Sequence, residues 1–181
     1  MLMLTVAVYN AHRRRLNADA DTVGAMIDRM GTADDVLWPV AESIPIEIEQ
    51  PLRIGSVGGH GPATYRVVGY QPGRWIRFEF SRPRCLFGFH EFCVQPESGG
   101  GVILQHLLAV RLRPLGWLLY PLGLKPLHDQ VIEKLLDQAE LATTGFIHGE
   151  PTRFSRGVRV RITAIRFYRM VRRDPGTDSH Q

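Results

Sequence analysis

The chain has 181 residues, 44% of them hydrophobic, and carries a formal net charge of +4 at pH 7. This length and composition predict one globular domain plus an extension. No apolar run approaches the roughly 20 residues that span a bilayer. Residues 1–150 hold 14 Lys and Arg against 16 Asp and Glu, so the body gives no reason to expect DNA as a partner.

The N-terminus and the cysteines indicate a reducing compartment. The apolar stretch MLMLTVAVY precedes its arginines, whereas a secretory signal carries its positive charge first. Cys85 and Cys93 are too few for a disulfide framework, and no Cys/His spacing is typical of zinc sites. We therefore expect a cytoplasmic protein with free cysteines, no cofactor and no bound metal.

The first third of the chain predicts a strand followed by two short helices. Residues 4–16 are rich in β-forming residues. Asp19 or Asp21 can cap a helix whose apolar stripe has helical spacing and which ends before Gly31. Residues 32–38 predict a second short helix.

From residue 44 onward the apolar period changes to two, which is typical of strands. A strand is expected at residues 44–48. Residues 63–71 and 74–81 predict a hairpin across Pro72-Gly73, a pair that fits a type II turn. Residues 88–95 and 102–112 predict a second hairpin. Hairpins pair neighbouring strands, so the sheet is expected to be antiparallel.

The helical period returns beyond Pro126 and continues to Gly145, a natural helix stop. An antiparallel sheet needs a cover for its apolar face, and this long helix offers the only large apolar stripe. We therefore predict an α+β helix-grip fold, in which a curved antiparallel sheet wraps around a long C-terminal helix. This domain is expected over residues 1–148, with a basic, Arg-rich extension over 149–181.

The glycine-rich stretch GSVGGHGP at residues 55–62 raises the question of a phosphate site. Phosphate-binding loops follow a strand and open a helix, whereas this stretch precedes a predicted strand and lacks the Walker lysine. Its glycines are expected to permit positive φ angles where the chain reverses into the sheet. His60 can cap this turn or reach the rim of a cavity, and the turn is favoured.

The chain resembles the START-like superfamily, also called SRPBCC or polyketide cyclase/dehydrase proteins. The resemblance covers the element order of residues 4–145 and the stretches PLRIGSVGGHGPATYRV, GYQPGRWIRFEF, HEF and KPLHDQ, which are similar to uncharacterised bacterial members. It implies a mostly apolar cavity between sheet and long helix that holds a lipid, polyketide or similar molecule. It carries no catalytic motif, so no catalytic residue follows from it.

Strand alternation predicts which residues form the cavity wall. Pairing Val94 with Val102 also pairs His90 with His106, and placing Gln71 opposite Arg74 pairs further inward residues. Two histidines on an apolar wall can grip a ligand or act as acid and base, or they can simply hydrogen-bond within the core. The expected ligand-binding residues are Tyr65, Val67, Ile76, Phe78, Phe80, His90, Phe92, Leu104, His106, Leu108, His128, Val131 and Leu135.

Three functional hypotheses follow. The favoured one is a binding or carrier module for a hydrophobic small molecule, because no complete catalytic constellation is present. The second is a cyclase/dehydratase-like enzyme that uses His90 and His106 as its candidate catalytic residues. Two histidines without a third ligand beside them make a poor metal site. Asp129 is expected to need no function beyond a favourable position near a helix start.

The third hypothesis is a membrane-peripheral lipid-transfer protein, and it rests on the basic tail. As a helix, the tail places Val160, Ala164, Phe167, Tyr168 and Val171 on one side. Such a segment can contact an anionic membrane or a partner, or can pack on the body by its apolar side. RNA is a lower-ranked alternative. The expected membrane or partner contacts are Arg159, Arg166, Arg169 and Arg173.

Overall fold

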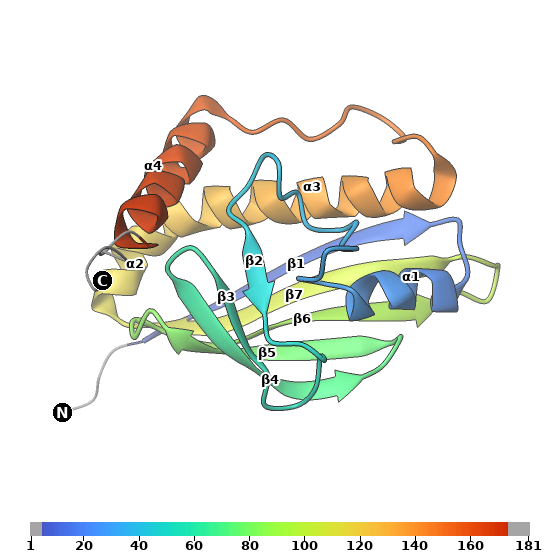
Figure 1. Ribbon diagram of the computed structural model, residues 1–181, viewed down its shortest axis with the longest axis horizontal. Helices are drawn as coiled ribbons and strands as arrows, with labels where there is room; N and C mark the ends of the chain where they lie inside the picture. The colour runs from blue at the N-terminus through green and yellow to red at the C-terminus, as the bar shows by residue number, and fades with distance from the viewer. Residues whose placement is uncertain (1–4, 174–181) are drawn as a thin grey trace, which may run out of the picture.

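The structure is a computed structural model that describes residues 5–173, and one seven-stranded antiparallel sheet forms its centre (Figure 1). The strand order is β1-β7-β6-β5-β4-β3-β2. The strands are β1 (Val6–Leu16), β2 (Ile46–Ile48), β3 (Val57–His60), β4 (Ala63–Gln71), β5 (Trp75–Arg82), β6 (Leu86–Pro96) and β7 (Val102–Leu112).

Helices cover one face of this sheet. The longest helix, α3, runs along the sheet, and α4 packs against α3 near one end of it (Figure 1). The predicted α+β helix-grip fold is confirmed, and its division into residues 1–148 and 149–181 stays a prediction. The helices are α1 (Ala20–Asp28), α2 (Pro114–Leu119), the π-helical turn η1 (Tyr120–Leu124), α3 (Lys125–Thr144) and α4 (Arg156–Arg173).

The capping residue of α1 is Asp19, whose side chain accepts a hydrogen bond from the Thr22 backbone N–H at 2.7 Å. The prediction of a second short helix at residues 32–38 is wrong, because this segment forms turns. The Asp35 carboxylate accepts hydrogen bonds from the backbone N–H groups of Gly31, Leu37 and Trp38. Carboxylates that bind nearby backbone amides in this way compete with helix formation.

Part of the glycine-rich stretch is a strand rather than a turn. Residues 57–60 form β3, which lies between β2 and β4 in the sheet. A Cβ on Gly59 would lie 2.4 Å from the carbonyl oxygen of Ala63, so glycine permits the close approach of β4. Gly61, with φ +58°, turns the chain between β3 and β4. The stretch leads into a strand, as predicted, and therefore has no helix N-terminus to offer a phosphate.

The β4–β5 hairpin has the predicted register at its centre. Tyr65 pairs with Phe80 and Val67 with Phe78. At the turn, Gln71 pairs with Trp75 and not with the predicted Arg74, and a bulge between Val67 and Gly69 absorbs the difference.

The β6–β7 hairpin differs from the prediction by two residues. His90 pairs with Leu108, and His106 pairs with Phe92. The loop is shorter than predicted, because β6 continues to Pro96, which pairs with Val102. A shift of two residues keeps every side chain on its predicted face, so both histidines still point to the same side of the sheet.

The core lies between the sheet and α3. Leu135, Leu136 and Ala139 of α3 are fully buried, and they pack in one cluster with Phe78 and Phe92 of the sheet. Gly145, with φ +80°, ends α3 in the left-handed conformation that the sequence predicts.

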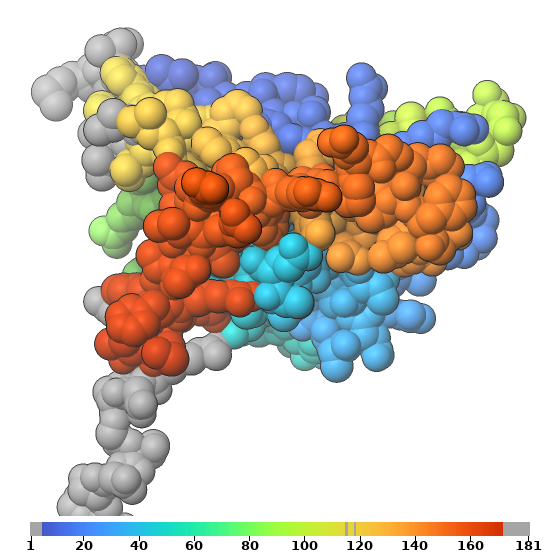
Figure 2. All heavy atoms as spheres, turned by 90° about the horizontal axis from the view of Figure 1, so that it is seen from above, coloured from blue at the N-terminus to red at the C-terminus, as the bar shows by residue number. Residues whose placement is uncertain are grey.

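The side of α4 that packs against the rest of the domain is not the apolar side that the sequence predicts. Val158 and Ile162 are buried in the main core cluster, and Ile165 packs against it. The side chains of Val160 and Phe167, on the predicted apolar side, are more than half exposed. Figure 2 shows α4, in red, lying against the segment that leads into β2, in cyan.

Candidate functional site

A small cavity lies between the sheet and α3, with a volume of about 100 Å³. Its wall is mostly apolar, but four histidines, from β3, β6, β7 and α3, contribute to it. The lining residues are Trp38, Ser43, Ile44, His60, Pro62, Ala63, Phe80, Pro83, Leu86, His90, Phe92, His106, Leu108, Tyr120, Leu124, Leu127, His128, Val131 and Ile132.

The structure divides the expected ligand-binding residues into two groups. Seven of them line this cavity: Phe80, His90, Phe92, His106, Leu108, His128 and Val131. The other six are fully buried in the main core cluster and do not line it: Tyr65, Val67, Ile76, Phe78, Leu104 and Leu135.

His60, which the sequence placed either in a turn or at the cavity rim, lines the cavity from the end of β3. Its ring lies 5.1 Å from that of Trp38, and its Nδ1 lies 3.4 Å from the Tyr65 hydroxyl. The preference for a purely turn-forming role was therefore wrong. Because the glycine-rich stretch was interpreted as a turn, the alternation that would have pointed His60 inward was not applied to it.

The histidines form a row through the site. His106 Nε2 and His90 Nδ1 are 3.4 Å apart. The ring of His106 lies 5.0 Å from that of His128, which lies 5.9 Å from the ring of His12. The expectation that no third residue of ligating type lies beside the histidine pair is wrong, since α3 brings His128 and β1 brings His12 to it.

Burial keeps these imidazoles neutral. Desolvation, followed by the charges of neighbouring histidines, lowers the pKa of His90 and of His106 well below the usual value. The same causes, with Arg169 contributing, lower the pKa of His60 to about 4. Desolvation also lowers the pKa of His128, although Asp129 opposes this effect. At neutral pH each ring therefore offers one hydrogen-bond donor and one acceptor.

Several of these ring nitrogens have no hydrogen-bond partner among the described residues. They are Nε2 of His90, Nδ1 of His106 and Nε2 of His128, all of them buried. Buried polar atoms in native proteins nearly always have a partner. Unpaired nitrogens that line a cavity are therefore suited to hydrogen bonds with a molecule bound there.

A second polar group lies beside the cavity, where β1 faces the start of α3. His12 Nδ1 lies 2.6 Å from Glu133 Oε1, and His12 Nε2 lies 3.4 Å from Asp129 Oδ1. Asn10 donates a hydrogen bond to the same Asp129 oxygen at 2.7 Å, and Lys125 pairs with the other oxygen. Burial raises the pKa of Asp129, but its polar contacts with His128, Lys125 and Asn10 outweigh this effect and lower the pKa well below its usual value.

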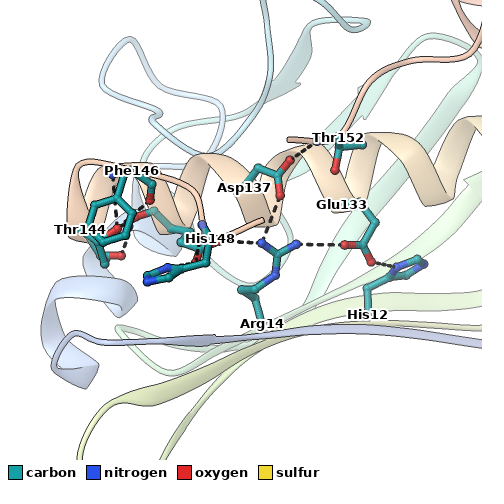
Figure 3. Close-up of polar contacts among 10 residues, drawn as sticks. His12, Arg14, Glu133, Asp137, Thr144, Phe146, His148 and Thr152 are labelled. Carbon is teal, nitrogen blue, oxygen red and sulfur yellow. Dashed lines mark hydrogen bonds and ion pairs between the residues drawn. The ribbon is translucent and has the colours of Figure 1, made fainter. Parts of the chain in front are cut away.

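Arg14 extends this polar layer along α3 (Figure 3). Its guanidinium lies 3.2 Å from Glu133, 3.1 Å from Asp137 and 2.7 Å from Glu140. Asp137 also accepts a hydrogen bond from the Thr152 backbone N–H at 2.6 Å. Arg14 therefore ties β1 to α3, and Asp137 ties α3 to the segment that leads into α4.

The tail arginines were expected to contact a membrane or partner, but two of them bind the body. Arg166 donates hydrogen bonds to the backbone carbonyls of Val40, Ala41 and Ser43. Arg169 donates to the Pro45 carbonyl and pairs with Glu47. Arg159 is exposed, and the side chain of Arg173 lies outside the described part of the chain. Across residues 5–173, no helix combines the length and apolarity needed to cross a membrane.

A comparison of the sequence with protein-family models and with curated proteins finds no match. Solved structures share the fold. Truncated norcoclaurine synthase from Thalictrum flavum is 13% identical with a TM-score of 0.59, and the match covers 80% of this chain and 98% of that chain.

Two further structures come from biosynthetic or bacterial proteins. The di-domain ARO/CYC protein StfQ of the steffimycin pathway is 14% identical with a TM-score of 0.57, over 77% of this chain and 51% of that chain. CalU16 from Micromonospora echinospora is 16% identical with a TM-score of 0.52, and the match covers 91% of this chain and 98% of that chain. At these identities the likeness shows the fold alone, which is the helix-grip fold that the sequence predicts.

Proposed function

We propose that the protein binds a small, largely apolar molecule that carries at least one hydroxyl or carbonyl group. The observation that supports this is the cavity wall, in which neutral histidines with unpaired nitrogens interrupt an apolar surface. Small-molecule sites typically combine an apolar lining with a few polar groups that fix orientation.

The energetics favour such a mixed ligand over a pure hydrocarbon. A buried polar atom without a partner costs about 1–3 kcal/mol, and a ligand hydroxyl that hydrogen-bonds His90 Nε2 or His106 Nδ1 removes that cost. A hydrocarbon of the same shape would leave both nitrogens unpaired.

The size of the cavity suits a molecule of about one ring. A dry cavity of roughly 150 Å³ holds benzene, and this cavity measures about 100 Å³. A single-ring ligand therefore requires small movements of the wall, whereas a lipid or polyketide requires α3 or its neighbours to move. A solved norcoclaurine synthase is in complex with dopamine and hydroxybenzaldehyde, which are single-ring molecules.

A matched pair of probes tests the proposal. Calorimetric titration with phenol and with toluene should show binding of both, with phenol preferred. In His106→Phe the preference should fall about 2- to 10-fold, the loss expected for one hydrogen bond. His148→Ala, an exposed histidine outside the cavity, should keep the preference. Absence of binding by either probe, together with an empty cavity in native mass spectrometry, would contradict the proposal.

A second candidate function is acid–base catalysis of the cyclase/dehydratase kind. The 3.4 Å approach of His90 and His106 favours it, because two neutral imidazoles in contact can pass a proton between them. StfQ, which shares the fold, is a di-domain ARO/CYC protein. If wild type, His90→Phe and His106→Phe convert a polyketide-like substrate at equal rates, the histidines have no catalytic role.

The exposed side of α4 favours an additional, membrane-peripheral role. Val160, Phe167 and Val171 are more than half exposed on one side of the helix, and Arg156 and Arg159 are exposed near its start. An apolar stripe with flanking arginines suits the surface of an anionic membrane. Sedimentation with phosphatidylserine-containing vesicles should show binding that Phe167→Glu weakens at least 5-fold. Gln95→Glu, which changes the charge equally at another exposed site, should leave binding unchanged.

A further inference from the structure

The side chains of His12, His128 and Asp129 converge where β1 faces the start of α3. Each offers one ligating atom, and these atoms all lie within 4.8 Å of one another. His12 Nε2 is 3.4 Å and His128 Nδ1 is 3.6 Å from Asp129 Oδ1. We propose that these three residues form a binding site for a divalent transition-metal ion such as Zn²⁺ or Co²⁺.

The distances suit such an ion with little movement. Zinc lies about 2.0–2.1 Å from imidazole nitrogens and carboxylate oxygens, so tetrahedral ligand atoms are about 3.3 Å apart. The two distances to Asp129 Oδ1 exceed this value by only a few tenths of an ångström. Two imidazoles and one carboxylate form a donor set for zinc, cobalt or ferrous iron, and calcium or magnesium prefers oxygen ligands alone.

The surrounding residues hold the ligands in the orientation that a metal requires. Glu133 lies 2.6 Å from Nδ1 of His12 (Figure 3). This contact leaves Nε2 of the same ring free, 3.4 Å from Asp129 Oδ1. Histidines that bind a metal usually donate their other ring N–H to a carboxylate in this way. Arg14 holds Glu133 at 3.2 Å, and Asn10 fixes the ligating oxygen of Asp129 from the same strand.

An independent observation points to a ligand at this place. Nε2 of His12 and both ring nitrogens of His128 are buried without a hydrogen-bond partner among the described residues. At 3.4 and 3.6 Å from Asp129 Oδ1, Nε2 of His12 and Nδ1 of His128 are farther away than in an ordinary hydrogen bond. A neutral imidazole that donates its proton elsewhere, as Nδ1 of His12 can to Glu133, has a lone pair on its other nitrogen to offer to a cation.

The site adjoins the cavity and shares His128 with it, whereas His12 and Asp129 do not line the cavity. Lys125 is the competitor of the metal, because its ammonium group pairs with the second oxygen of Asp129. Substitutions of a ligand and of Lys125 should therefore change the metal affinity in opposite directions. Removing a ligand should weaken metal binding, whereas removing Lys125 should strengthen it by releasing the carboxylate.

The experiment uses the full chain, freed of metal with EDTA and dialysed. Titration with Zn²⁺ should show one ion per chain, and Co²⁺ should give visible absorption bands at the same stoichiometry. His12→Asn and Asp129→Asn should each weaken Zn²⁺ binding at least 10-fold, and Glu133→Gln should weaken it about 10- to 100-fold. Lys125→Met should tighten binding 3-fold or more.

The matched control is His148→Ala, which removes a histidine paired with Glu140 elsewhere on α3 and should leave Zn²⁺ affinity unchanged. Thermal unfolding of each metal-free variant separates loss of the site from loss of the fold. No Zn²⁺ binding below 100 µM by the wild type would overturn the proposal. So would wild-type affinity in well-folded His12→Asn and Asp129→Asn, or a Lys125→Met variant that binds no more tightly.

Discussion

Gly24 of α1 lies directly against the turn between β4 and β5. A Cβ at this position would lie 2.1 Å from the carbonyl oxygen of Gly73. Gly73 cannot retreat easily, because its backbone N–H donates to the carboxylate of Asp28 at 2.9 Å. Tyr70 donates a hydrogen bond to the same carboxylate. The contact is therefore fixed from both sides, by α1 and by the β4–β5 turn.

We predict that Gly24→Ala destabilises the protein by up to about 2 kcal/mol. Alanine improves helix propensity by about 1 kcal/mol, but overpacking against backbone atoms costs about 1–3 kcal/mol, and this clash is severe. Urea unfolding measures the difference. Gly123→Ala is the matched control, since no heavy atom lies within 4 Å of its Cβ position. Equal stability of Gly24→Ala and wild type would show that the turn moves freely.

At the scale of elements, Arg14 is the main polar connection between β1 and α3 (Figure 3). Asp137 and Glu140 are almost fully buried, so Arg14→Met would leave Asp137 without its cation and Glu140 with His148 as its remaining partner. Such a loss typically costs about 3–5 kcal/mol. Urea unfolding at pH 7 should show a loss of this size. Arg15→Met removes an exposed pair with Glu97 and an exposed hydrogen bond to the Gly100 carbonyl, and should cost about 1 kcal/mol or less.

The same elements show what the sequence can and cannot predict. Period-two alternation assigned the inward faces of both hairpins, because the pattern depends only on side-chain phase. It could not detect the two-residue shift of β6 against β7, since such a shift leaves the phase unchanged. The helix predicted at residues 32–38 failed because propensity does not show where the Asp35 carboxylate finds its backbone partners.

The candidate site was predicted in part for similar reasons. His90, His106 and His128 lie on elements whose periodicity is clear, and all three line the cavity. His12 was not predicted, because the sequence does not show which residues of β1 and β7 lie opposite each other. In the structure His12 pairs with His106. The orientation of α4 was missed because arginines and apolar residues share both of its sides, so only the packing partner decides which side faces the body.

At the scale of the whole molecule, the buried histidines link stability to pH. The pKa of His90 is far below its usual value, and that of His60 is about 4. Below the ordinary histidine pKa near 6.5, the unfolded chain binds protons that the folded protein excludes. Stability is therefore full above about pH 7 and falls as the pH drops through 6.5 toward 4.

We predict that each such histidine removes about 1 kcal/mol of stability between pH 7.5 and pH 5.5. Urea unfolding at both pH values, with EDTA present, measures the loss in wild type. His90→Phe, which can stack on Phe78 and Phe80, should show a loss smaller by about that amount. Phe92→Leu alters the same wall without a titrating group, so it should lower stability equally at both pH values. A pH dependence that is the same in wild type and His90→Phe would mean that His90 takes up its proton without unfolding, and that the cavity is open to water.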